Sequence, residues 1–598
     1  MRNWLKYKFD QVMAKGMHAQ LTLLALLGVL FLVGATALMM FVDTDISYWG
    51  QPMVSVQQVL WINLLHILDP TNLVFTRASG WVAAGVFLVI AVAGLFTVGA
   101  LIGIITAWIE DRTRDLRKGR SKVVERDHLV ILGWDNRVPG IVSGLAIAHE
   151  IVDGKKGRAR IAVLANRDLD QTEEELEDVD LKTSSLILRR GNPLDPEDLH
   201  IVSACSGRCI IIPAPISTTG DAQVIKTLLA LNNYIHGCLK HVVAELSDNE
   251  SYELARSISP DVNLVCADEI VSKVIAQSVL EPGLTEVYQT LFSFSSSEFY
   301  KFEVKDSHVA MGIETFGDLL LSSPTQIPVG LSHPDGTMLL PPDWDEPVYP
   351  GVRVITLSMD DVGLQVSRDR QSRRPEPVDP AGTSRWVERV LVYAGQNKKL
   401  PLIRSYLEAR GVEIEVREYP ACISNEKIDH QTVILLSEDI IEAQASDAVV
   451  MTQLLKLRNR QLTANIVAEI LEPENVELMW AARADDCVAS YQLSSSVLTQ
   501  ASYHPELLRV ISRLLDERGV RLKIRPVCDY METGSFQRLT VQAMARGEIA
   551  LGYFPNELDA PVINPSKGTV VPGEGKAILL EQRNMEVKDG DSKHCAKQ

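Results

Sequence analysis

The stretch HLVILGWDNRVPGIVSGLAIAHE, residues 128–150, decides the fold of most of this chain. It opens with an apolar run that predicts a buried strand, and Gly133 then marks a turn. Apolar residues recur at helical spacing after the turn, at Val138, Ile141, Val142 and Leu145. A buried strand that turns directly into an amphipathic helix is typical of the first unit of a nucleotide-binding-type α/β domain.

The alternation of strands and helices continues beyond this unit. Apolar runs predict strands at 160–164, 185–188, 209–213, 241–246 and 263–266, with a helix over 221–231. Strands that alternate with helices form a parallel sheet with helices on its faces. We therefore expect an α/β domain with a doubly wound sheet.

The turn after the first strand departs from a dinucleotide-binding loop. Such a loop follows the pattern GxGxxG, because glycines let the pyrophosphate approach the backbone. In the run from Gly133 to Gly140, Asp135 stands at the second glycine position and Asn136 follows it. Asn166 stands where the acidic ligand of the ribose is expected. A carboxylate at Asp135 repels pyrophosphate, so these residues argue against ordinary NAD binding.

An internal repeat indicates two copies of this domain. The segment from Arg389, RVLVYAGQNKKLPLIRSYLEARG, resembles the opening stretch, with Gly395 in place of Gly133. NIVAEILE from Asn465 matches HVVAELSD from His241, and a later pair of segments matches in the same order. Three matches in one order indicate duplication, with a shorter second copy. A smaller strand-rich piece follows each copy.

Composition limits the class of partner. The chain has 598 residues, too many for one core, and a formal net charge of −18. An acidic protein is not expected to use nucleic acid as its main partner, because phosphates require a basic surface. The 8 cysteines show neither CxxC pairs nor zinc-like spacing with histidine. We therefore expect neither a zinc site nor a disulfide framework.

Two uncharged apolar runs are the strongest membrane signal. Residues 20–42 and 81–108 each reach the ~20 residues that a helix needs to cross a bilayer. Arg and Lys are frequent before the first run and after the second, whereas 43–80 holds only Arg77. By the positive-inside rule we expect a multi-pass protein of the cell membrane, with two spans and both termini in the cytoplasm.

The segment between the two runs places polar residues in an apolar context. Residues 54–75 are too short to span, and a helix there is expected to end at Asp69-Pro70. We expect a re-entrant half-helix at the mouth of a pore, where four copies of Asp69 form a carboxylate ring that attracts cations. The pore and selectivity candidates are His66, Asp69, Pro70, Thr71 and Asn72. The alternative is an external amphipathic loop with a surface aspartate.

Glycines in the second apolar run have two interpretations. Gly94, Gly99 and Gly103 are candidates for a gating hinge, because glycine permits a helix to bend. Glycine also permits close packing of membrane helices, which is the commoner use. The sequence leaves both interpretations open for all three positions.

Acidic pairs in the soluble part are candidates for cation binding. Ca²⁺ prefers several converging oxygen ligands. The candidates are Asp178 and Asp180 in an acid-rich run, and the pairs Asp268-Glu269 and Asp485-Asp486 at matched points of the two copies. The alternatives are a solvated acidic surface for the first pair and helix capping for the other two.

Several motifs together resemble a known family. GWDNRVPGI at 133, RRGNPLDPEDL at 189, CIIIPAP at 209 and HVVAELSD at 241 resemble the regulator-of-potassium-conductance (RCK, TrkA-N-like) domain. LDPTN at 68 resembles the Ala-Asp-x-x-Asn filter segment of the plant CASTOR/POLLUX ion-channel family. Two RCK domains behind a two-span pore unit resemble a minimal prokaryotic relative of that family.

The resemblance carries expectations about fold and function. It implies a helical two-span membrane pore domain plus cytosolic α/β tandem RCK domains with Rossmann-like parallel sheets. It also implies a homotetrameric cation channel in contact with membrane lipid. A cytosolic RCK ring would gate the channel in response to a ligand, and calcium would be among the permeant or regulating ions.

The expected domain organisation follows the chain in order. It comprises a cytosolic segment (1–19), a pore domain (20–124) with spans at 20–42 and 81–108, a re-entrant segment at 54–75 and a linker at 109–124, a first RCK N-lobe (125–298) and C-lobe (299–366), a linker (367–384), a second N-lobe (385–535) and C-lobe (536–582), and a tail (583–598).

Two other functional classes fit parts of the sequence. One is a membrane-anchored NAD-dependent enzyme, and the other is a regulator of a separate potassium transporter. The enzyme is disfavoured because the nucleotide loop is damaged and no Ser-His-Asp, HExxH or Walker pattern stands out. The regulator is disfavoured because such subunits are normally soluble. A channel conducts cations, whereas an enzyme or a regulatory subunit does not, so a measurement of cation current distinguishes a channel from both classes.

Overall fold

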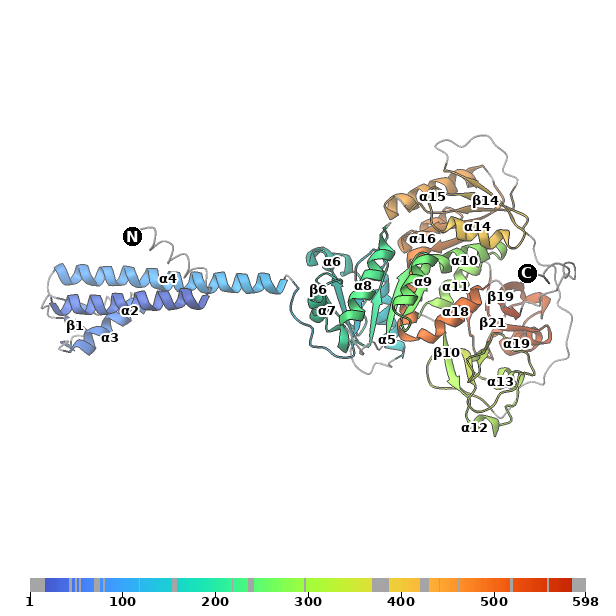
Figure 1. Cartoon of the computed structure of the whole chain (residues 1–598), viewed down its shortest axis with the longest axis horizontal. Helices are drawn as coiled ribbons and strands as arrows, with labels where there is room; N and C mark the ends of the chain where they lie inside the picture. Colours follow the sequence, from blue (N-terminus) through green and yellow to red (C-terminus); the bar gives the residue numbers. More distant parts are fainter. Residues whose placement is uncertain are drawn as a thin grey trace. The chain divides into compact units, whose positions relative to one another are not determined.

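The structure, a computed structural model, forms two compact units, Met1–Gly119 and Arg120–Gln598 (Figure 1). The residues described are 17–41, 46–48, 51–52, 55–68, 76–78, 81–117, 119–152, 159–217, 219–234, 241–294, 297–367, 387–419, 430–439, 441–460, 462–516, 520–556 and 559–582.

The first unit is a helical hairpin with a shorter helix packed against it. Its long helices are α2 (Met17–Phe41) and α4 (Trp81–Arg117), and α3 (Val56–Leu68) contacts both. Ala19–Phe41 and Gly85–Glu110 are long and apolar enough to cross a membrane. A small antiparallel sheet joins β1 (Ile46–Tyr48), β2 (Gln51–Pro52) and β3 (Thr76–Ala78). Because α4 continues to Arg117, the first part of the predicted linker 109–124 is helical.

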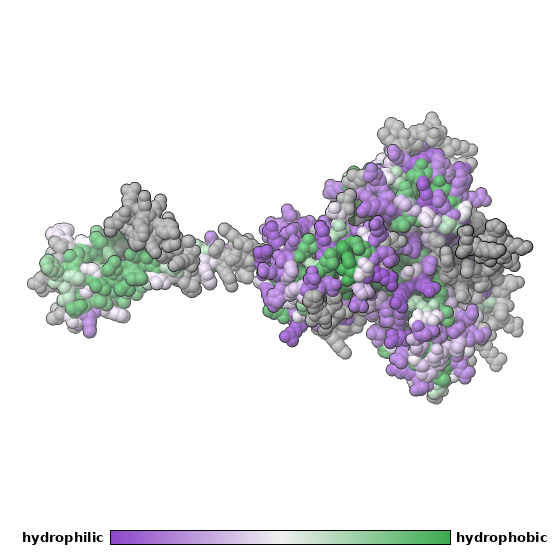
Figure 2. Space-filling model, in the orientation of Figure 1, coloured by the Kyte–Doolittle hydropathy of each residue, from purple (hydrophilic) through white to green (hydrophobic). Residues whose placement is uncertain are grey.

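The surface of this unit is apolar, as a lipid-facing or subunit-facing surface requires. Hydrophobic side chains cover the α2 and α4 helices in Figure 2. Leu26 is 65% exposed and Phe96 is 75% exposed, although both are large and apolar. A soluble monomer rarely leaves such a continuous apolar surface in water.

The second unit begins with a six-stranded parallel sheet. Its strands are β4 (Leu129–Leu132), β5 (Arg160–Ala165), β6 (Ser185–Arg190), β7 (Cys209–Ile212), β8 (Val242–Leu246) and β9 (Asn263–Cys266). Their order is β6-β5-β4-β7-β8-β9, and every pairing is parallel. The order reverses between β4 and β7, which makes that position the switch point where Rossmann folds bind ligands.

Helices cover both faces of this sheet. They are α5 (Val138–Val152), α6 (Leu169–Leu176), α7 (Pro196–Ile201), α8 (Gly220–Tyr234) and α9 (Asn249–Ile258). The next two helices, α10 (Ala267–Leu280) and α11 (Leu284–Phe292), contact strands of the second copy instead. Ile131, Ile141 and Leu145 are fully buried in the core between β4 and α5. The apolar spacing in the opening stretch therefore packs as predicted.

The second copy is a five-stranded parallel sheet. Its strands are β14 (Arg389–Tyr393), β15 (Glu413–Arg417), β16 (Thr432–Leu435), β17 (Asn465–Ile470) and β18 (Asp486–Ala489), in the order β15-β14-β16-β17-β18. Its helices are α14 (Leu400–Glu408), α15 (Ala443–Asn459), α16 (Val476–Ala481), α17 (Ser490–Tyr503) and α18 (Leu508–Leu515). Within the described residues, no strand of this copy corresponds to β6, which accounts for its shorter length.

Each copy is followed by a small antiparallel sheet of the same topology. The first holds β10 (Glu298–Glu303), β11 (Ile327–Ser332), β12 (Met338–Leu339) and β13 (Arg353–Ser358), in the order β10-β13-β11-β12. The second holds β19 (Val520–Pro526), β21 (Glu548–Phe554), β22 (Val562–Ile563) and β24 (Lys576–Gln582), in the order β19-β24-β21-β22. The helices beside them are α12 (Asp306–Val309), α13 (Phe316–Ser322) and α19 (Phe536–Ala545), and a short ribbon pairs β20 (Gly534–Ser535) with β23 (Val570–Val571).

The pairing of β19 corrects one predicted boundary. The sequence interpretation placed residues up to 535 in the second N-lobe, but β19 pairs with β24 along its whole length. The second C-lobe therefore begins at Val520 and not at residue 536. Buried and half-buried residues alternate along VRLKIRP, as expected for a strand with one covered face. The prediction overlooked this strand. The predicted fold class, two apolar spans followed by tandem Rossmann-like domains, is confirmed.

Candidate functional site

The predicted pore segment is described only up to its helix. Helix α3 ends at Leu68, directly before the Asp69-Pro70 step at which the sequence predicted a helix end. Asp69, Pro70, Thr71 and Asn72 lie outside the described residues. Their role at a pore mouth therefore stays a prediction.

The polar face of α3 is buried in the hairpin. His66 is fully buried and its ring meets Phe87 of α4 edge-on, with centroids 5.1 Å apart. Asn63 is also fully buried, and its amide donates a hydrogen bond to Thr36 Oγ1 on α2 at 3.1 Å. Within this chain, therefore, His66 contacts the second long helix, and Asn63 fixes α3 to the first. Sequence reasoning missed Asn63 and Thr36, although each stands out as a polar residue in an apolar run.

Of the three hinge candidates, Gly94 is a packing glycine. A Cβ atom built on Gly94 would lie 2.5 Å from the Ile67 carbonyl oxygen, so α3 and α4 are in backbone contact there. A Cβ atom at Gly99 or Gly103 would meet no atom within 4 Å. The hinge interpretation therefore remains a proposal only for Gly99 and Gly103.

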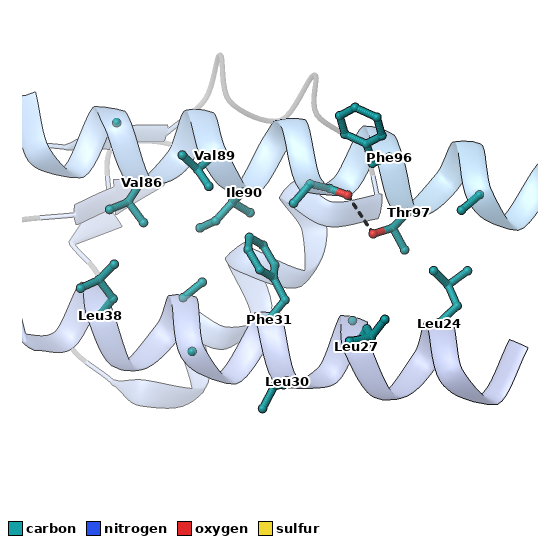
Figure 3. Close-up of a pocket in the computed structure, with 16 residues that line it drawn as sticks. Leu24, Leu27, Leu30, Phe31, Leu38, Val86, Val89, Ile90, Phe96 and Thr97 are labelled. Atoms are coloured by element: carbon teal, nitrogen blue, oxygen red, sulfur yellow. Dashed lines mark hydrogen bonds between the residues drawn. The ribbon is translucent and has the colours of Figure 1, made fainter. Parts of the chain in front are cut away.

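An apolar groove runs between α2 and α4 (Figure 3). Its volume is about 1100 Å³, and Phe31, Val86 and Ile90 are among the residues that line it. The hydroxyl of Thr97 also lines it but donates to the Ala93 carbonyl at 2.8 Å. Such a surface suits acyl chains or apolar side chains rather than ions.

The switch-point crevice of the first sheet is occupied by an arginine of the same chain. Gly133 turns with a φ of +114°, and the chain then places Arg137 directly before α5. One guanidinium nitrogen, Nη1, pairs with Glu245 on β8. The other, Nη2, pairs with Asp135 at 2.6 Å and also donates to the Ala214 carbonyl beyond β7. All three charged side chains are buried.

Electrostatics keep this arginine charged. Burial opposes the charge, but Glu245 and Asp135 together raise the pKa of Arg137 above its ordinary value. Asp135 is therefore neutralised by Arg137, which differs from the predicted repulsion of pyrophosphate by a bare carboxylate. Asn136 is exposed, and Asn166 is exposed directly after β5. Burial raises the pKa of Glu472, and a hydrogen bond between Glu472 and the Asn136 side chain opposes that rise.

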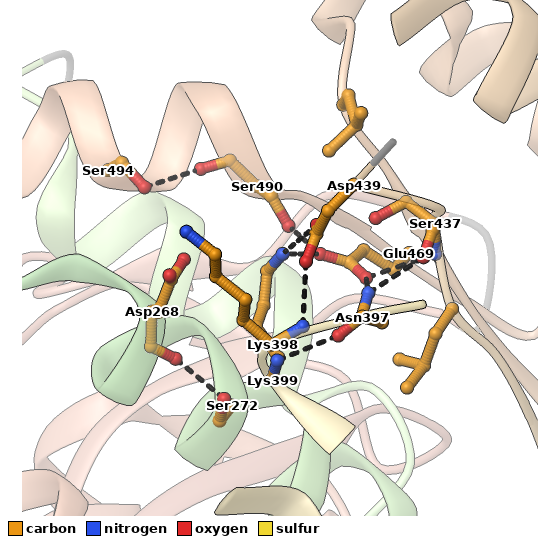
Figure 4. A network of polar contacts seen from close by, with 12 residues as sticks. Asp268, Ser272, Asn397, Lys398, Lys399, Ser437, Asp439, Glu469, Ser490 and Ser494 are labelled. Carbon is orange, nitrogen blue, oxygen red and sulfur yellow. Dashed lines mark hydrogen bonds and ion pairs between the residues drawn. The ribbon is translucent and has the colours of Figure 1, made fainter. Parts of the chain in front are cut away.

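The second copy repeats the arrangement with a lysine (Figure 4). Lys399 stands directly before α14, and its ammonium lies 3.0 Å from Glu469 on β17 and 3.7 Å from Asp439. Ser490 Oγ and the Ser437 backbone N–H also donate to Glu469, at 2.6 and 3.1 Å. Burial disfavours the Glu469 charge, but Lys399 and these donors together lower its pKa.

The two copies thus share one construction. A cation before the first helix pairs with a buried glutamate two strands further along the sheet, Arg137 with Glu245 and Lys399 with Glu469. In both copies a backbone N–H after the intervening strand also donates to that glutamate. Sequence comparison of the repeats aligned the glycines but did not reveal this shared ion pair.

The first helix of the first copy, α5, also packs closely on α17, the helix that follows the last strand of the second copy. A Cβ atom on Gly140 of α5 would lie 3.0 Å from Ser495 Oγ of α17, and one on Gly144 would lie 2.8 Å from Thr499 Oγ1. Ser495 Oγ also donates to the Arg137 carbonyl at 3.2 Å. Gly140 therefore serves contact between the copies rather than approach of a phosphate.

A polar cavity of about 520 Å³ lies between the two switch points. Arg137 and Asp268 line it from the first copy, and Lys398, Glu438 and Asp439 line it from the second. Burial raises the pKa of Asp439, with Lys399 opposing the rise. Of the predicted cation-binding residues, Asp268 alone lines this cavity.

The other predicted acidic residues do not converge. Asp178 is exposed, Asp180 pairs with Lys182 at 2.5 Å, and Glu269 pairs with Lys273 at 2.7 Å. Asp485 pairs with Arg458, whereas the neighbouring Asp486 is buried and accepts the Gly283 N–H at 2.8 Å. In the part of the chain that the structure describes, no group of three or more His, Cys, Asp or Glu side chains could hold a metal ion.

The predicted match between the two acidic pairs is wrong. Asp268 and Glu269 lie in the first turn of α10, after β9 has ended. Asp486 is the first residue of β18 and Asp485 directly precedes it, so the pair lies four and five residues before α17 begins at Ser490. Similar letters therefore stand at different structural positions, and neither pair supplies the N-cap residue of its helix.

This architecture has a counterpart among solved structures. It consists of tandem Rossmann lobes, each followed by a small antiparallel sheet. The human SLO3 gating ring has this fold, with a TM-score of 0.55 and 12% identity over 76% of this chain and 99% of that one.

Sequence comparisons are more specific. A family model described as "Castor and Pollux, part of voltage-gated ion channel" matches residues 268–373. The ion channel CASTOR of Lotus japonicus is 25% identical, covering 90% of this chain and 71% of that protein. The probable ion channel POLLUX of Arabidopsis thaliana is 25% identical, covering 95% and 76%. The predicted resemblance to the CASTOR/POLLUX ion-channel family is confirmed.

Proposed function

We propose that this chain is a subunit of a homotetrameric cation channel of the cell membrane, with both termini in the cytoplasm. The observation that carries the proposal is continuous similarity to ion channels over about nine tenths of the chain. The two apolar helices and the gating-ring fold agree with it. Four subunits with two RCK domains each would form a ring of eight RCK domains that gates the pore in response to a ligand.

The segment behind the second span supports transmission from ring to pore. Helix α4 ends at Arg117, and by Val123 the chain is already fixed to the first N-lobe. The Val123 N–H donates to the Ile201 carbonyl at 2.7 Å, and Arg189 Nε donates to the Ser121 carbonyl at 2.6 Å. Lobe movement would therefore reach the pore helix through very few residues.

Neither NAD chemistry nor a calcium site is favoured by the described residues. Arg137 and Lys399 occupy the two crevices in which a dinucleotide would bind. The family resemblance implies calcium, but the acidic side chains described here do not converge in a coordination sphere. We therefore propose a channel without enzymatic turnover, and assign no gating step to calcium.

Planar-bilayer recording of the purified protein tests the proposal. Cation current is expected, and Asp69→Asn should reduce unitary cation conductance several-fold, because it removes four charges from the proposed ring. Asp178→Asn is the matched control, because this exposed residue lies far along the chain from the pore segment and loses the same charge. Absence of current together with NAD turnover would support the membrane-anchored enzyme instead.

A further inference from the structure

One sheet face of the first C-lobe gathers basic side chains. Arg353 on β13 stands directly opposite Glu303 on β10 and Ser332 on β11, so the three residues form a row on one face. Lys301 lies two residues before Glu303 and therefore projects to the same face. Its side chain is only 7% exposed.

The second N-lobe covers this face and closes a cavity. A short turn, Pro505–Leu507, leads into α18 and brings Glu506 and Arg509 to the cavity. The volume is about 580 Å³, which is in the range of small-molecule sites. Three cations, Lys301, Arg353 and Arg509, line it with two carboxylates, Glu303 and Glu506.

The cations here are only loosely neutralised. Glu506 Oε2 lies 3.7 Å from Lys301 Nζ and 3.8 Å from Arg353 Nη1, both beyond hydrogen-bond length. Lys301 instead donates to the Glu506 backbone carbonyl at 3.2 Å. Among the described residues, no hydrogen bond engages the guanidinium groups of Arg353 and Arg509. The cavity therefore holds unused N–H donors around an excess of positive charge.

The remaining polar groups at the rim do not change this balance. His333 is held by the Tyr349 hydroxyl at 3.2 Å and by Glu346 at 3.6 Å. Gly336 and Gly351 turn with positive φ beside the cavity, and a Cβ atom on either would find no atom closer than 4.0 Å. The wall at this point is open backbone rather than side chain.

We propose that this cavity binds the phosphoryl group of a small phosphorylated molecule, bridging the first C-lobe and the second N-lobe. Guanidinium groups fit phosphate oxygens through two parallel hydrogen bonds, and a lysine adds a point charge. The volume exceeds that of phosphate alone, so the rest of the ligand occupies the space beside the two glycines. This site is separate from both switch-point crevices, and its occupancy does not depend on whether the chain conducts ions.

The charges around Lys301 favour the binding of an anion. Burial lowers the pKa of Lys301, Arg509 and Arg353 add to the fall, and Glu506 opposes it. A bound oxyanion would raise that pKa again, because it compensates the crowded positive charges. Affinity is therefore lost as the pH rises through the pKa of Lys301.

Calorimetric titration of the full chain in detergent with inorganic pyrophosphate tests the site. Saturable binding is expected at low ionic strength, weakened about tenfold or more by Arg353→Gln and by Arg509→Gln. Arg513→Gln is the matched control, because it removes the same charge from an exposed position further along α18. Thermal unfolding of each variant shows whether it remains folded.

Three outcomes would overturn the proposal. The first is heat no greater than that of sodium chloride at equal ionic strength. The second is an equal loss of affinity in Arg513→Gln and Arg509→Gln, which would show diffuse charge attraction. The third is unchanged affinity in both cavity variants while they remain folded. Weaker binding of inorganic phosphate than of pyrophosphate supports a ligand with more than one anionic group.

Discussion

At the scale of single residues, each of the two Rossmann lobes holds a buried cation at its switch point. Arg137 and Lys399 take the place that a dinucleotide pyrophosphate has in a binding Rossmann fold, and each is held by a buried glutamate. Breaking such a pair leaves the partner charge buried without compensation, which costs about 3–5 kcal/mol.

Lys399→Met should therefore destabilise the second lobe by about 3–5 kcal/mol. Lys398→Met is its control, because Lys398 is an exposed neighbour whose ammonium has no short ion pair among the described residues. Thermal unfolding followed by intrinsic fluorescence measures the difference, and a clearly lower melting temperature is expected only for Lys399→Met. Equal melting temperatures would show that the buried pair contributes little to the fold.

A buried aspartate makes the stability of the second unit depend on pH. Burial raises the pKa of Asp486 to about 7, although the Gly283 N–H and the Thr285 side chain oppose the rise. The folded protein therefore keeps a proton that the unfolded chain releases near pH 4. Stability should fall as the pH rises from about 4 to about 7, by about 1.4 kcal/mol for each pH unit between the two pKa values.

Asp486→Asn should flatten that profile, because the amide accepts the same hydrogen bond without titrating. Melting temperature against pH measures it, with Asp178→Asn as the control for loss of an exposed carboxylate. A variant profile as steep as that of the unaltered protein would assign the pH dependence to other groups.

At the scale of elements, much could be predicted from periodicity. The five later strands of the first sheet lie within a few residues of the apolar runs that predicted them, because buried parallel strands are short apolar segments. The positions of ion pairs could not be predicted in the same way. Arg137 and Lys399 are different residue types, and their glutamate partners lie 108 and 70 residues further along the chain.

The misplaced acidic pairs show the same limit. Asp268-Glu269 and Asp485-Asp486 match as letters, but the ends of β9 and β18 differ in position relative to them. Only the boundaries of α10 and α17 reveal that the two pairs differ in position by six residues relative to the helix start. Likewise Gly140 looked like part of a phosphate loop, whereas its neighbour is a serine of the other copy.

The contact of α3 with α4 yields a test at this scale. Gly94→Ala should place a methyl group against the Ile67 backbone, which forces the helices apart and costs about 1–3 kcal/mol. Gly99→Ala is its control, because nothing lies within 4 Å of that position. Melting of the detergent-solubilised protein should fall for Gly94→Ala alone, and an unchanged melting temperature would show that the contact is absent.

At the scale of the whole molecule, duplication accounts for the architecture of the second unit. Two Rossmann lobes and two small sheets of equal strand order pack into one compact unit, whose internal contacts include α5 with α17 and α10 with α14. The span unit is compact by itself, and the chain joins the two units near Gly119. A change in this short connection should alter the proposed coupling between ring and pore while it leaves the residues of both units unchanged.

Insertion of three glycines after Gly119 should therefore weaken ligand-dependent gating while leaving unitary conductance unchanged. A longer flexible connection transmits less of the lobe movement to the pore helix. Open probability in single-channel records measures the gating, and the current amplitude serves as its internal control. Gating as steep as in the unaltered protein would show that the connection does not carry the coupling.

The reversal potential in a planar bilayer tests the central claim most directly. With purified protein between two potassium chloride solutions of unequal concentration, the account predicts discrete currents whose reversal potential lies near the cation equilibrium potential. A reversal potential near the chloride equilibrium potential, or no protein-dependent current under any ligand condition, would contradict it.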